Sequence, residues 1–561
     1  MNRFLAGLAL LLAACATAPS APAYDVAIRG GTVYDGGGGA PYRGDVGLRG
    51  DRIAYVGPRL DAPARAEIDA AGLAVAPGFI NMLSWANESL IEDPRGQSDI
   101  RQGVTLEVMG EGESMGPWSD EMKRLETQRQ GDIRYKIEWT SLGDYLAWLE
   151  EKGVSPNVAS FVGATTVRVH ELGEGDVDPT PAQLERMRAL VRAAMNEGAM
   201  GVGSSLIYAP AYFAETPELI ALAEEAGKCG GMYISHIRDE GPKLFEAIDE
   251  LVAISAASGA PAEIYHFKQS GKSNWGKIDA AIARVEAARA RGLRITADMY
   301  TYAASSTGLD AAMPLWVQEG GIEAWVARLK DPALRARALA EMRSGRVSEN
   351  SDLVVREPSK VLLLGFKTTA LKPLTGKTLE EVARTRGKSP EETAADLVVE
   401  DNSRIQVAYF SMSEDNVRRE VALPWMSFGS DASAQAPEGV FLKSSTHPRA
   451  YGNFARLLGR YVRDERVLTL QEAVRRATAL PAANLGLEDR GALKPGHFAD
   501  LAIFDPATIR DNATFAQPQL YATGMRHVFV NGVQVLRDGE HTGATPGRFV
   551  RGPGWRKCPA N

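Results

Sequence analysis

The central part of the chain alternates between short apolar runs and longer amphipathic segments. A short apolar run bounded by turn residues is typical of a strand covered on both faces, as strands of a parallel sheet are. Residues 181–197, which begin with Pro181, have the pattern of a helix, and residues 278–291 are a second example. This alternation predicts a parallel sheet whose strands are connected by helices.

The apolar runs can be counted as eight strands, the number in a (β/α)8 barrel. They cover residues 73–80, 105–110, 157–162, 200–205, 232–236, 263–266, 294–300 and 426–431. Two more strand-like runs, at 360–366 and 405–410, lie inside a stretch at about 303–425 that is much longer than an ordinary crossover. We assign this stretch to an insertion or lid, together with the last helices of the barrel.

The two ends of the chain have a different pattern. Residues 24–76 and 486–552 consist of short strand-like runs separated by turn residues, and Asn531-Gly532 is a strong hairpin signal. Neither end alone is long enough to bury a core. We expect the two ends to form one small β-sandwich, which leaves residues 77–485 for the barrel.

The first residues resemble a bacterial lipoprotein signal. Arg3 precedes an apolar run at 4–12 that is too short to span a bilayer, and Leu12-Ala-Ala-Cys15 resembles a lipobox. We therefore predict a signal peptide at 1–15, lipidation of Cys15 and a tether at 16–23. The protein would then be anchored in the bacterial cell envelope, facing the periplasm or on the outer membrane. The alternative is an ordinary signal peptide with a chance cysteine.

Composition and charge narrow the class of protein. The 561 residues are 45% apolar and 24% charged, which allows a large core and more than one domain. The formal net charge is -8 and no basic run is present, so a nucleic-acid partner is not expected. Three cysteines exclude a disulfide framework. A single bridge between Cys229 and Cys558 is an alternative, but we favour two separate thiols.

Four polar side chains lie at the carboxyl ends of predicted strands, where barrel enzymes place their catalytic groups. His236, His266 and Asp431 each end a strand, and Glu111 follows another. Only seven histidines exist in the chain, so two at consecutive strand ends are informative. Taken alone, each of these residues would more often have a structural role in the core or on the surface. As a set, imidazole and carboxylate groups suit Zn²⁺, with Asp431 as a proton shuttle.

This type of site predicts hydrolysis of an amide. Zinc lowers the pKa of its bound water to about 7 and polarises a carbonyl oxygen. Asp431 would take the water proton during attack on the amide carbon and pass it to the departing nitrogen, which is otherwise a poor leaving group.

Short motifs spread along the chain are weak singly but specific as a set. They include Pro77-Gly-Phe-Ile80, Gly103-Val-Thr105, Ser235-His-Ile-Arg-Asp-Glu-Gly241, His266-Phe-Lys268, Ala297-Asp-Met-Tyr300, Gly429-Ser-Asp431 and His447-Pro-Arg-Ala-Tyr-Gly452. Through them the chain resembles the N-acyl-D-amino-acid deacylases of the amidohydrolase superfamily over nearly its full mature length. The resemblance implies a (β/α)8 barrel with a small β-sandwich, and zinc-dependent hydrolysis of N-acyl-D-amino acids.

The resemblance also implies roles for individual residues. His236 and His266 match the two zinc-binding histidines, and Asp431 matches the catalytic aspartate. The family's zinc-binding cysteine is missing, and the segment that replaces it is one residue shorter. Alignment of both ends of that segment puts Glu111 at the cysteine position, with Glu113 as the second choice.

A larger departure from the family occurs at the first strand. The family has two histidines there, but this chain has Leu83 and Trp85, neither of which can replace them as a metal ligand. The resemblance therefore implies one zinc ion per chain, and it leaves room for impaired or altered catalysis.

The resemblance places Lys268, Tyr300 and Ser306 where the family holds the carboxylate of its small-molecule amide substrate. Lys268 has an alternative role, the pairing of a barrel acid. Three functions remain open: hydrolysis of N-acyl-D-amino acids, another amidohydrolase reaction on a cyclic amide, carbamate or dipeptide, and binding by a lipid-anchored inactive enzyme. The retained set of metal and catalytic candidates counts against the last. The sequence does not indicate an oligomeric state.

Overall fold

The computed structural model describes residues 23–345, 347–555 and 558. The predicted signal peptide at 1–15, the lipidated Cys15 and nearly all of the tether at 16–23 lie outside these residues. Within the described part, no helix combines the length and the apolar character that a bilayer span requires.

Nine parallel strand segments form the centre of the molecule, in two sheets. One sheet has six strands in the order β17-β13-β12-β11-β10-β9, and the other has the order β6-β7-β8. Their bounds are β6 (Phe79–Asn81), β7 (Val104–Met109), β8 (Asn157–Ser160), β9 (Val162–Gly163), β10 (Gly201–Ser205), β11 (Met232–His236), β12 (Ala262–Ile264), β13 (Ile295–Met299) and β17 (Met426–Phe428).

Backbone contacts join the two sheets at both edges. At one edge, the N–H of Met200, directly before β10, donates to Ser160 O in β8 at 3.0 Å. At the other edge, Met82 N donates to Phe428 O at 3.2 Å, and Ser84 and Ala432 form a parallel bridge. The two sheets are therefore in contact, and buried residues from both belong to one apolar cluster.

The prediction of a single first strand at 73–80 is wrong. The structure has two strands here, β5 (Ala74–Pro77) and β6, and they belong to different sheets. The chain crosses from one sheet to the other at Gly78, where a Cβ would overlap the side chain of Thr105. An uninterrupted apolar run does not reveal this change of sheet, because both halves are buried.

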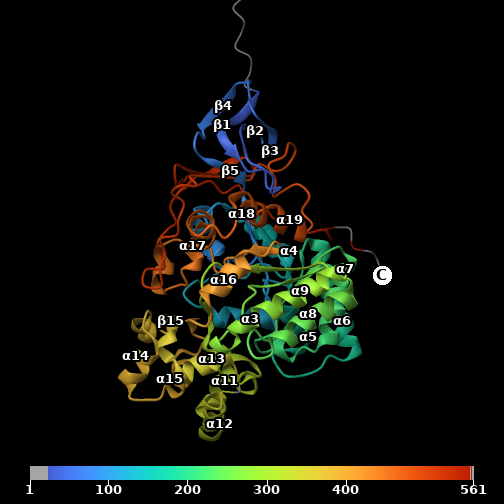
Figure 1. The fold of residues 1–561 in the computed structure, drawn as a ribbon. Helices are drawn as coiled ribbons and strands as arrows, with labels where there is room; N and C mark the ends of the chain where they lie inside the picture. Colours follow the sequence, from blue (N-terminus) through green and yellow to red (C-terminus); the bar gives the residue numbers. More distant parts are fainter. Residues whose placement is uncertain (1–22, 346, 556–557, 559–561) are drawn as a thin grey trace, which may run out of the picture.

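Helices cover the outside of the parallel strands. Their bounds are α1 (Ser89–Glu92), α2 (Gln97–Ile100), α3 (Asp120–Arg129), α4 (Leu142–Lys152), α5 (Ala164–Leu172), α6 (Pro181–Glu197), α7 (Thr216–Lys228), α8 (Leu244–Ser258), α9 (Ile278–Ala290), α16 (Glu414–Val421), α17 (Arg449–Arg456), α18 (Leu470–Ala477) and α19 (Ala479–Asn484). Figure 1 shows α6 to α9 packed side by side along one flank. The predicted helix 181–197 is confirmed as α6, and Thr180 and Gln183 form its capping box.

The two ends of the chain share one nine-stranded sheet, at one end of the molecule in Figure 1. Its strand order is β21-β20-β19-β18-β5-β1-β2-β3, with β4 paired to β1. The bounds are β1 (Tyr24–Val33), β2 (Tyr42–Arg49), β3 (Arg52–Gly57), β4 (Ala64–Asp69), β18 (Leu501–Phe504), β19 (Met525–Val530), β20 (Val533–Arg537) and β21 (Glu540–His541). Asn531 and Gly532 form the predicted hairpin turn, both with positive φ, as a two-residue turn requires.

The stretch around 303–425 has its own hydrophobic cluster and its own antiparallel sheet, in the order β14-β16-β15. The strands are β14 (Ser305–Gly308), β15 (Val361–Gly365) and β16 (Gln406–Tyr409). The helices are α10 (Leu315–Gln318), α11 (Gly321–Lys330), α12 (Pro332–Arg343), α13 (Glu349–Arg356), α14 (Leu379–Arg386) and α15 (Pro390–Asp401). Figure 1 shows this region in yellow, at the end of the molecule opposite β1 to β4.

Residues 542–555, which we call the C-terminal strap, run beside the amino ends of the parallel strands. Val550 N donates to Val158 O at 2.9 Å, and Gly552 N donates to Gly198 O at 2.9 Å. Beyond the strap, Cys558 forms a disulfide with Cys229 at the end of α7. The interpretation of two separate thiols is therefore wrong, because the strap returns the chain to α7 across a sequence separation of 329 residues.

Candidate metal centre and active site

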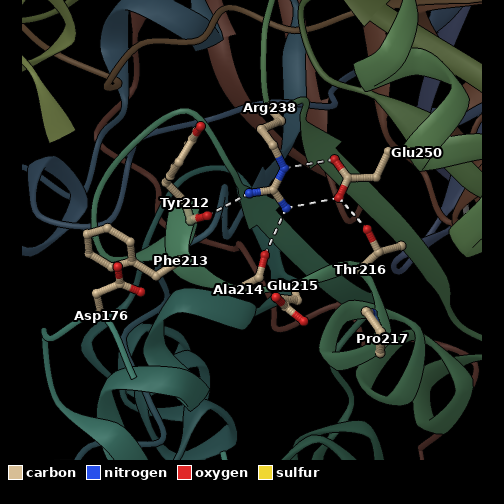
Figure 2. Close-up of a pocket in the computed structure, with 9 residues that line it drawn as sticks. All are labelled: Asp176, Tyr212, Phe213, Ala214, Glu215, Thr216, Pro217, Arg238 and Glu250. Atoms are coloured by element: carbon tan, nitrogen blue, oxygen red, sulfur yellow. Dashed lines mark hydrogen bonds and ion pairs between the residues drawn. The ribbon is translucent and has the colours of Figure 1, made fainter. Parts of the chain in front are cut away.

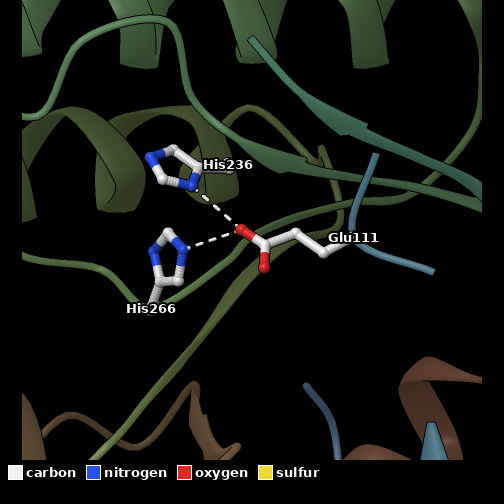
Figure 3. A group of neighbouring side chains, drawn as sticks. All are labelled: Glu111, His236 and His266. Carbon is white, nitrogen blue, oxygen red and sulfur yellow. Dashed lines mark hydrogen bonds and ion pairs between the residues drawn. The ribbon is translucent and has the colours of Figure 1, made fainter. Parts of the chain in front are cut away.

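Three buried side chains converge at the carboxyl ends of the parallel strands. Oε1 of Glu111 lies 2.9 Å from His236 Nδ1 and 3.0 Å from His266 Nε2 (Figure 3). The three potential ligand atoms all lie within 4.8 Å of one another. His236 ends β11, His266 follows β12 by two residues and Glu111 follows β7 by two residues. We call these residues the triad.

The local backbone turns these side chains inward. Gly110 and Gly112 flank Glu111 with φ values of 103° and 72°, and a Cβ on either would overlap neighbouring strands. His266 itself has a φ of 35°, a strained conformation for a residue other than glycine. The buried carboxylate of Asp298 accepts the backbone N–H of His266 at 2.8 Å and holds this turn.

Burial and neighbouring charges shift the pKa values of all three triad residues. Burial favours the neutral acid, but His266 and His236 hold the pKa of Glu111 well below its usual range. Burial and Lys268 disfavour a charged imidazole at His266, yet Glu111 and Glu240 raise its pKa to about 10. Burial lowers the pKa of His236. The Glu111 carboxylate is therefore ionised beside the two imidazoles.

This donor set fits a divalent cation. A single oxygen of Glu111 accepts hydrogen bonds from two imidazoles, and an ion placed there would replace both protons with bonds to nitrogen and oxygen, the ligand atoms that zinc takes. His236 Nε2 is buried and has no hydrogen-bond partner among the described residues. With its proton on Nε2, His236 presents an unprotonated Nδ1 to the ion.

Lys268 and Glu240 contact His266 at Nδ1, the ring nitrogen that does not face Glu111. Lys268 Nζ lies 2.6 Å from Glu240 Oε1 and 2.7 Å from His266 Nδ1, and Glu240 Oε1 lies 3.1 Å from the same Nδ1. The predicted substrate ligand Lys268 thus does pair with an acid, which was its alternative role. A carboxylate behind a metal-binding histidine fixes the tautomer and orientation of the ring.

Asp431 lies beside the triad. Its Oδ1 accepts a hydrogen bond from Trp85 Nε1 at 3.1 Å, and its Oδ2 pairs with Arg449 Nη2 at 2.8 Å. The same Trp85 N–H also donates to Glu111 Oε2 at 2.9 Å. Burial raises the pKa of Asp431, although Arg449 opposes this shift. A raised pKa suits a group that must accept a proton and then release it.

The other predicted residues occupy different positions. Glu113 is exposed and is not part of the triad. The hydroxyl of Tyr300 donates to Met412 Sδ at 3.4 Å, and that of Ser306 donates to Val407 O at 2.9 Å. Their roles in substrate binding stay predictions.

Two residues next to Asp431 were missed by the sequence analysis, Trp85 and Arg449. The guanidinium of Arg449 is buried and lies 4.4 Å from the centre of the Tyr300 ring. Its Nε and Nη1 have no hydrogen-bond partner in the part of the chain that the structure describes. The sequence signal for Arg449 is the motif 447–452, which carries the resemblance but does not indicate a contact with Asp431.

A separate open cavity of about 440 Å³ lies near α7 and is lined by Asp176, Tyr212, Phe213, Ala214, Glu215, Thr216, Pro217, Arg238 and Glu250 (Figure 2). The guanidinium of Arg238 donates to both oxygens of Glu250 at 2.9 Å. It also donates to the backbone oxygens of Tyr212 and Ala214. Arg238 is therefore occupied structurally, and the cavity contains no member of the triad.

Comparison with known proteins identifies the family. A sequence model of the amidohydrolase family matches residues 66–536. This chain belongs to the amidohydrolase family. Among curated amidohydrolases, it is 34% identical over 534 residues to the D-aminoacylase of Alcaligenes xylosoxydans xylosoxydans, a match that covers 94% of this chain and 97% of the relative. It is 32% identical to the N-acyl-D-glutamate deacylase of the same organism, over 94% of this chain and 96% of that protein.

A solved structure agrees with this placement. The N-acyl-D-glutamate deacylase of Bordetella bronchiseptica, crystallised with zinc and a phosphonate inhibitor, is 30% identical and has a TM-score of 0.78. The match covers 94% of this amidohydrolase and 99% of the deacylase. The chain is therefore an amidohydrolase of the N-acyl-D-amino-acid deacylase branch, a hydrolase of carbon–nitrogen bonds other than peptide bonds.

Proposed function

We propose that this amidohydrolase cleaves the amide bond of N-acyl-D-amino acids or closely related small amides, with one zinc ion held by Glu111, His236 and His266. The observation that carries the proposal is the convergence of these three buried side chains beside Asp431. The D-aminoacylase and N-acyl-D-glutamate deacylase relatives support the substrate class. The described residues contain one such group of ligands, which supports a single ion.

We also propose that the two parallel sheets form a (β/α)8 barrel across 77–485, with an insertion around 303–425. The hydrogen bonds at both sheet edges support closure, with β8 and β9 as one interrupted strand. The shared sheet and the apolar cluster between 24–76 and 486–552 support a β-sandwich from both chain ends. All catalytic candidates then lie at the carboxyl end of the barrel, as in other barrel enzymes.

The chemistry can be divided between the ion and the side chains. When bound, a zinc ion lowers the pKa of water and polarises a carbonyl oxygen. Asp431 Oδ1, held by one donor from Trp85, retains a lone pair for the proton that water loses as its oxygen bonds to the amide carbon. Asp431 then gives this proton to the nitrogen as the carbon–nitrogen bond breaks, which yields a carboxylic acid and an amine.

Arg449 offers a site for the substrate carboxylate. Among the described residues, Nε and Nη1 of this buried guanidinium have no acceptor, so each can donate a charge-assisted hydrogen bond to a carboxylate. The pair between Nη2 and Asp431 fixes this guanidinium next to the catalytic aspartate. Lys268, Tyr300 and Ser306 would surround the same carboxylate, with Lys268 acting mainly through Glu240.

We propose that the enzyme works in the bacterial cell envelope, anchored through Cys15. Support comes from the lipobox-like Leu12-Ala-Ala-Cys15 and from the disulfide between Cys229 and Cys558, because disulfides persist in oxidising compartments. Labelling with a radioactive fatty acid should mark the full chain and should not mark the C15A variant. Equal labelling of both would contradict the anchor.

One experiment tests the proposed activity. Purified enzyme should contain one zinc ion per chain by elemental analysis and should hydrolyse members of a panel of N-acetyl-D-amino acids. The L-enantiomers of the same compounds should react far more slowly. Zinc with no turnover of either series would point to another amidohydrolase reaction. Absence of both zinc and turnover would favour the binding-protein alternative.

A further inference from the structure

Trp85 is held rigidly between the triad and Asp431. Its backbone N–H donates to Ala432 O at 3.0 Å, and the N–H of Asp431 donates to Leu83 O at 2.9 Å. The segment after β6 therefore runs alongside the segment after β17, and the position of Trp85 is fixed relative to Asp431. Its side chain is 37% exposed, so burial of the ring is not its main contribution.

The indole N–H of Trp85 is shared by two carboxylates. It lies 2.9 Å from Glu111 Oε2 and 3.1 Å from Asp431 Oδ1. Glu111 therefore divides its oxygens, with Oε1 toward the imidazoles and Oε2 toward the indole. Figure 3 shows the second oxygen of Glu111 turned away from both histidines.

We propose that Trp85 is a positioning residue, whose N–H holds the Glu111 and Asp431 carboxylates at one separation and aims Glu111 Oε1 at the ion. This inference rests on the proposed function. Two neighbouring carboxylates repel each other, and a donor placed between them offsets that repulsion. Without the N–H, the Glu111 carboxylate is free to rotate about its last torsion, which is broad for glutamate.

Asp431 is held on its second side by Arg449, so the two oxygens of this carboxylate have different partners. Loss of the indole N–H releases Oδ1 and leaves Oδ2 in place. The aspartate would then turn away from the water that it deprotonates, while the substrate carboxylate site at Arg449 stays intact. The predicted signature is a loss in kcat with little change in KM.

The test compares W85F with W148F. Phenylalanine at position 85 keeps an aromatic ring and deletes the N–H. Trp148 is a matched control, because its indole N–H also donates to a carboxylate, Glu138 Oε2 at 3.2 Å, away from the site. Zinc affinity is measured without substrate by competition with a chelator, and kcat and KM are measured on the best N-acetyl-D-amino acid of the panel.

Zinc affinity and kcat should each fall about 10- to 100-fold in W85F, the usual cost of removing a partner of a metal ligand. KM should change less than about threefold, and W148F should match the wild type in all three quantities. Unchanged zinc affinity and kcat in W85F, with an active wild type, would overturn the role of Trp85 alone. A wild type without zinc binding would overturn the proposed function and this inference together.

Discussion

The two ends of the parallel strands contrast in chemistry. At the carboxyl ends lie the triad and Asp431, ionisable groups that pair with one another or with Arg449. At the amino ends lie apolar side chains, including Met200, Met232 and Leu485, with Val550 of the C-terminal strap packed among them. The carboxyl ends of these strands therefore carry the candidate active site, and the amino ends are covered by apolar packing. Substitutions at the two ends should therefore affect different measurable quantities.

The largest effect is expected from D431N at the carboxyl ends. Asparagine keeps the shape of the side chain but cannot carry the proton, so kcat should fall by about two to four orders of magnitude. Zinc content and the melting temperature should stay near those of the wild type. A variant that retains a tenth of the wild-type kcat would remove Asp431 from the proposed chemistry.

The next comparison separates the two candidate carboxylate ligands. In E111Q a neutral amide replaces the anion that faces both imidazoles, and zinc affinity should fall by more than about 100-fold, beyond the usual cost of an outer partner. E113Q is the matched control, because Glu113 is exposed and outside the triad, and its zinc affinity should not change. The reverse result, measured by chelator competition, would assign the metal to Glu113.

At the amino ends, L485A should cost stability and leave the chemistry intact. Leu485 is 1% exposed and belongs to the apolar cluster within the strands, so its truncation should lower the free energy of unfolding by about 2–5 kcal/mol. The value of kcat at a temperature where the variant is folded should match the wild type. A large drop in kcat would show that the two ends are coupled.

The smallest of these effects should come from C558S, which removes the disulfide to Cys229. Its loss should lower the free energy of unfolding by about 2–4 kcal/mol. Deacylation and zinc content should be unchanged. The wild type treated with a reductant should reproduce the lower stability, whereas reduction of C558S should have no further effect.

The contrast between regular strand ends and tertiary contacts also separates the features that the sequence predicts from those that it does not. The strand ends predicted that Glu111, His236 and His266 would lie together, because the carboxyl ends of parallel strands meet at one edge. Arg449 gave no such signal, since it comes from a helix and its relation to Asp431 depends on the tertiary fold. For Trp85 the sequence shows only that a metal ligand is missing, because its role as a donor depends on the two carboxylates that the fold places beside it.

Local sequence was least informative where two distant segments meet. The split of 73–80 at Gly78 depends on the neighbouring Thr105. The disulfide depends on the path of the C-terminal strap, which places Cys558 against α7. Likewise, the sequence offered a substrate carboxylate and a buried acid as alternative partners of Lys268, and only the fold places Glu240 beside it.

The pairing of β5 with β18 has a consequence for how the protein is made. In this antiparallel pair Pro77 lies opposite Leu501. The early strand β5 therefore cannot form this pairing until β18, one of the last strands, has been synthesised. Contacts between such distant segments form slowly, and the unpaired edge of an early strand is exposed to aggregation in the meantime. The shared sheet therefore closes only after synthesis of nearly the entire chain, and until then this edge of the early strand is open to pairing with other chains.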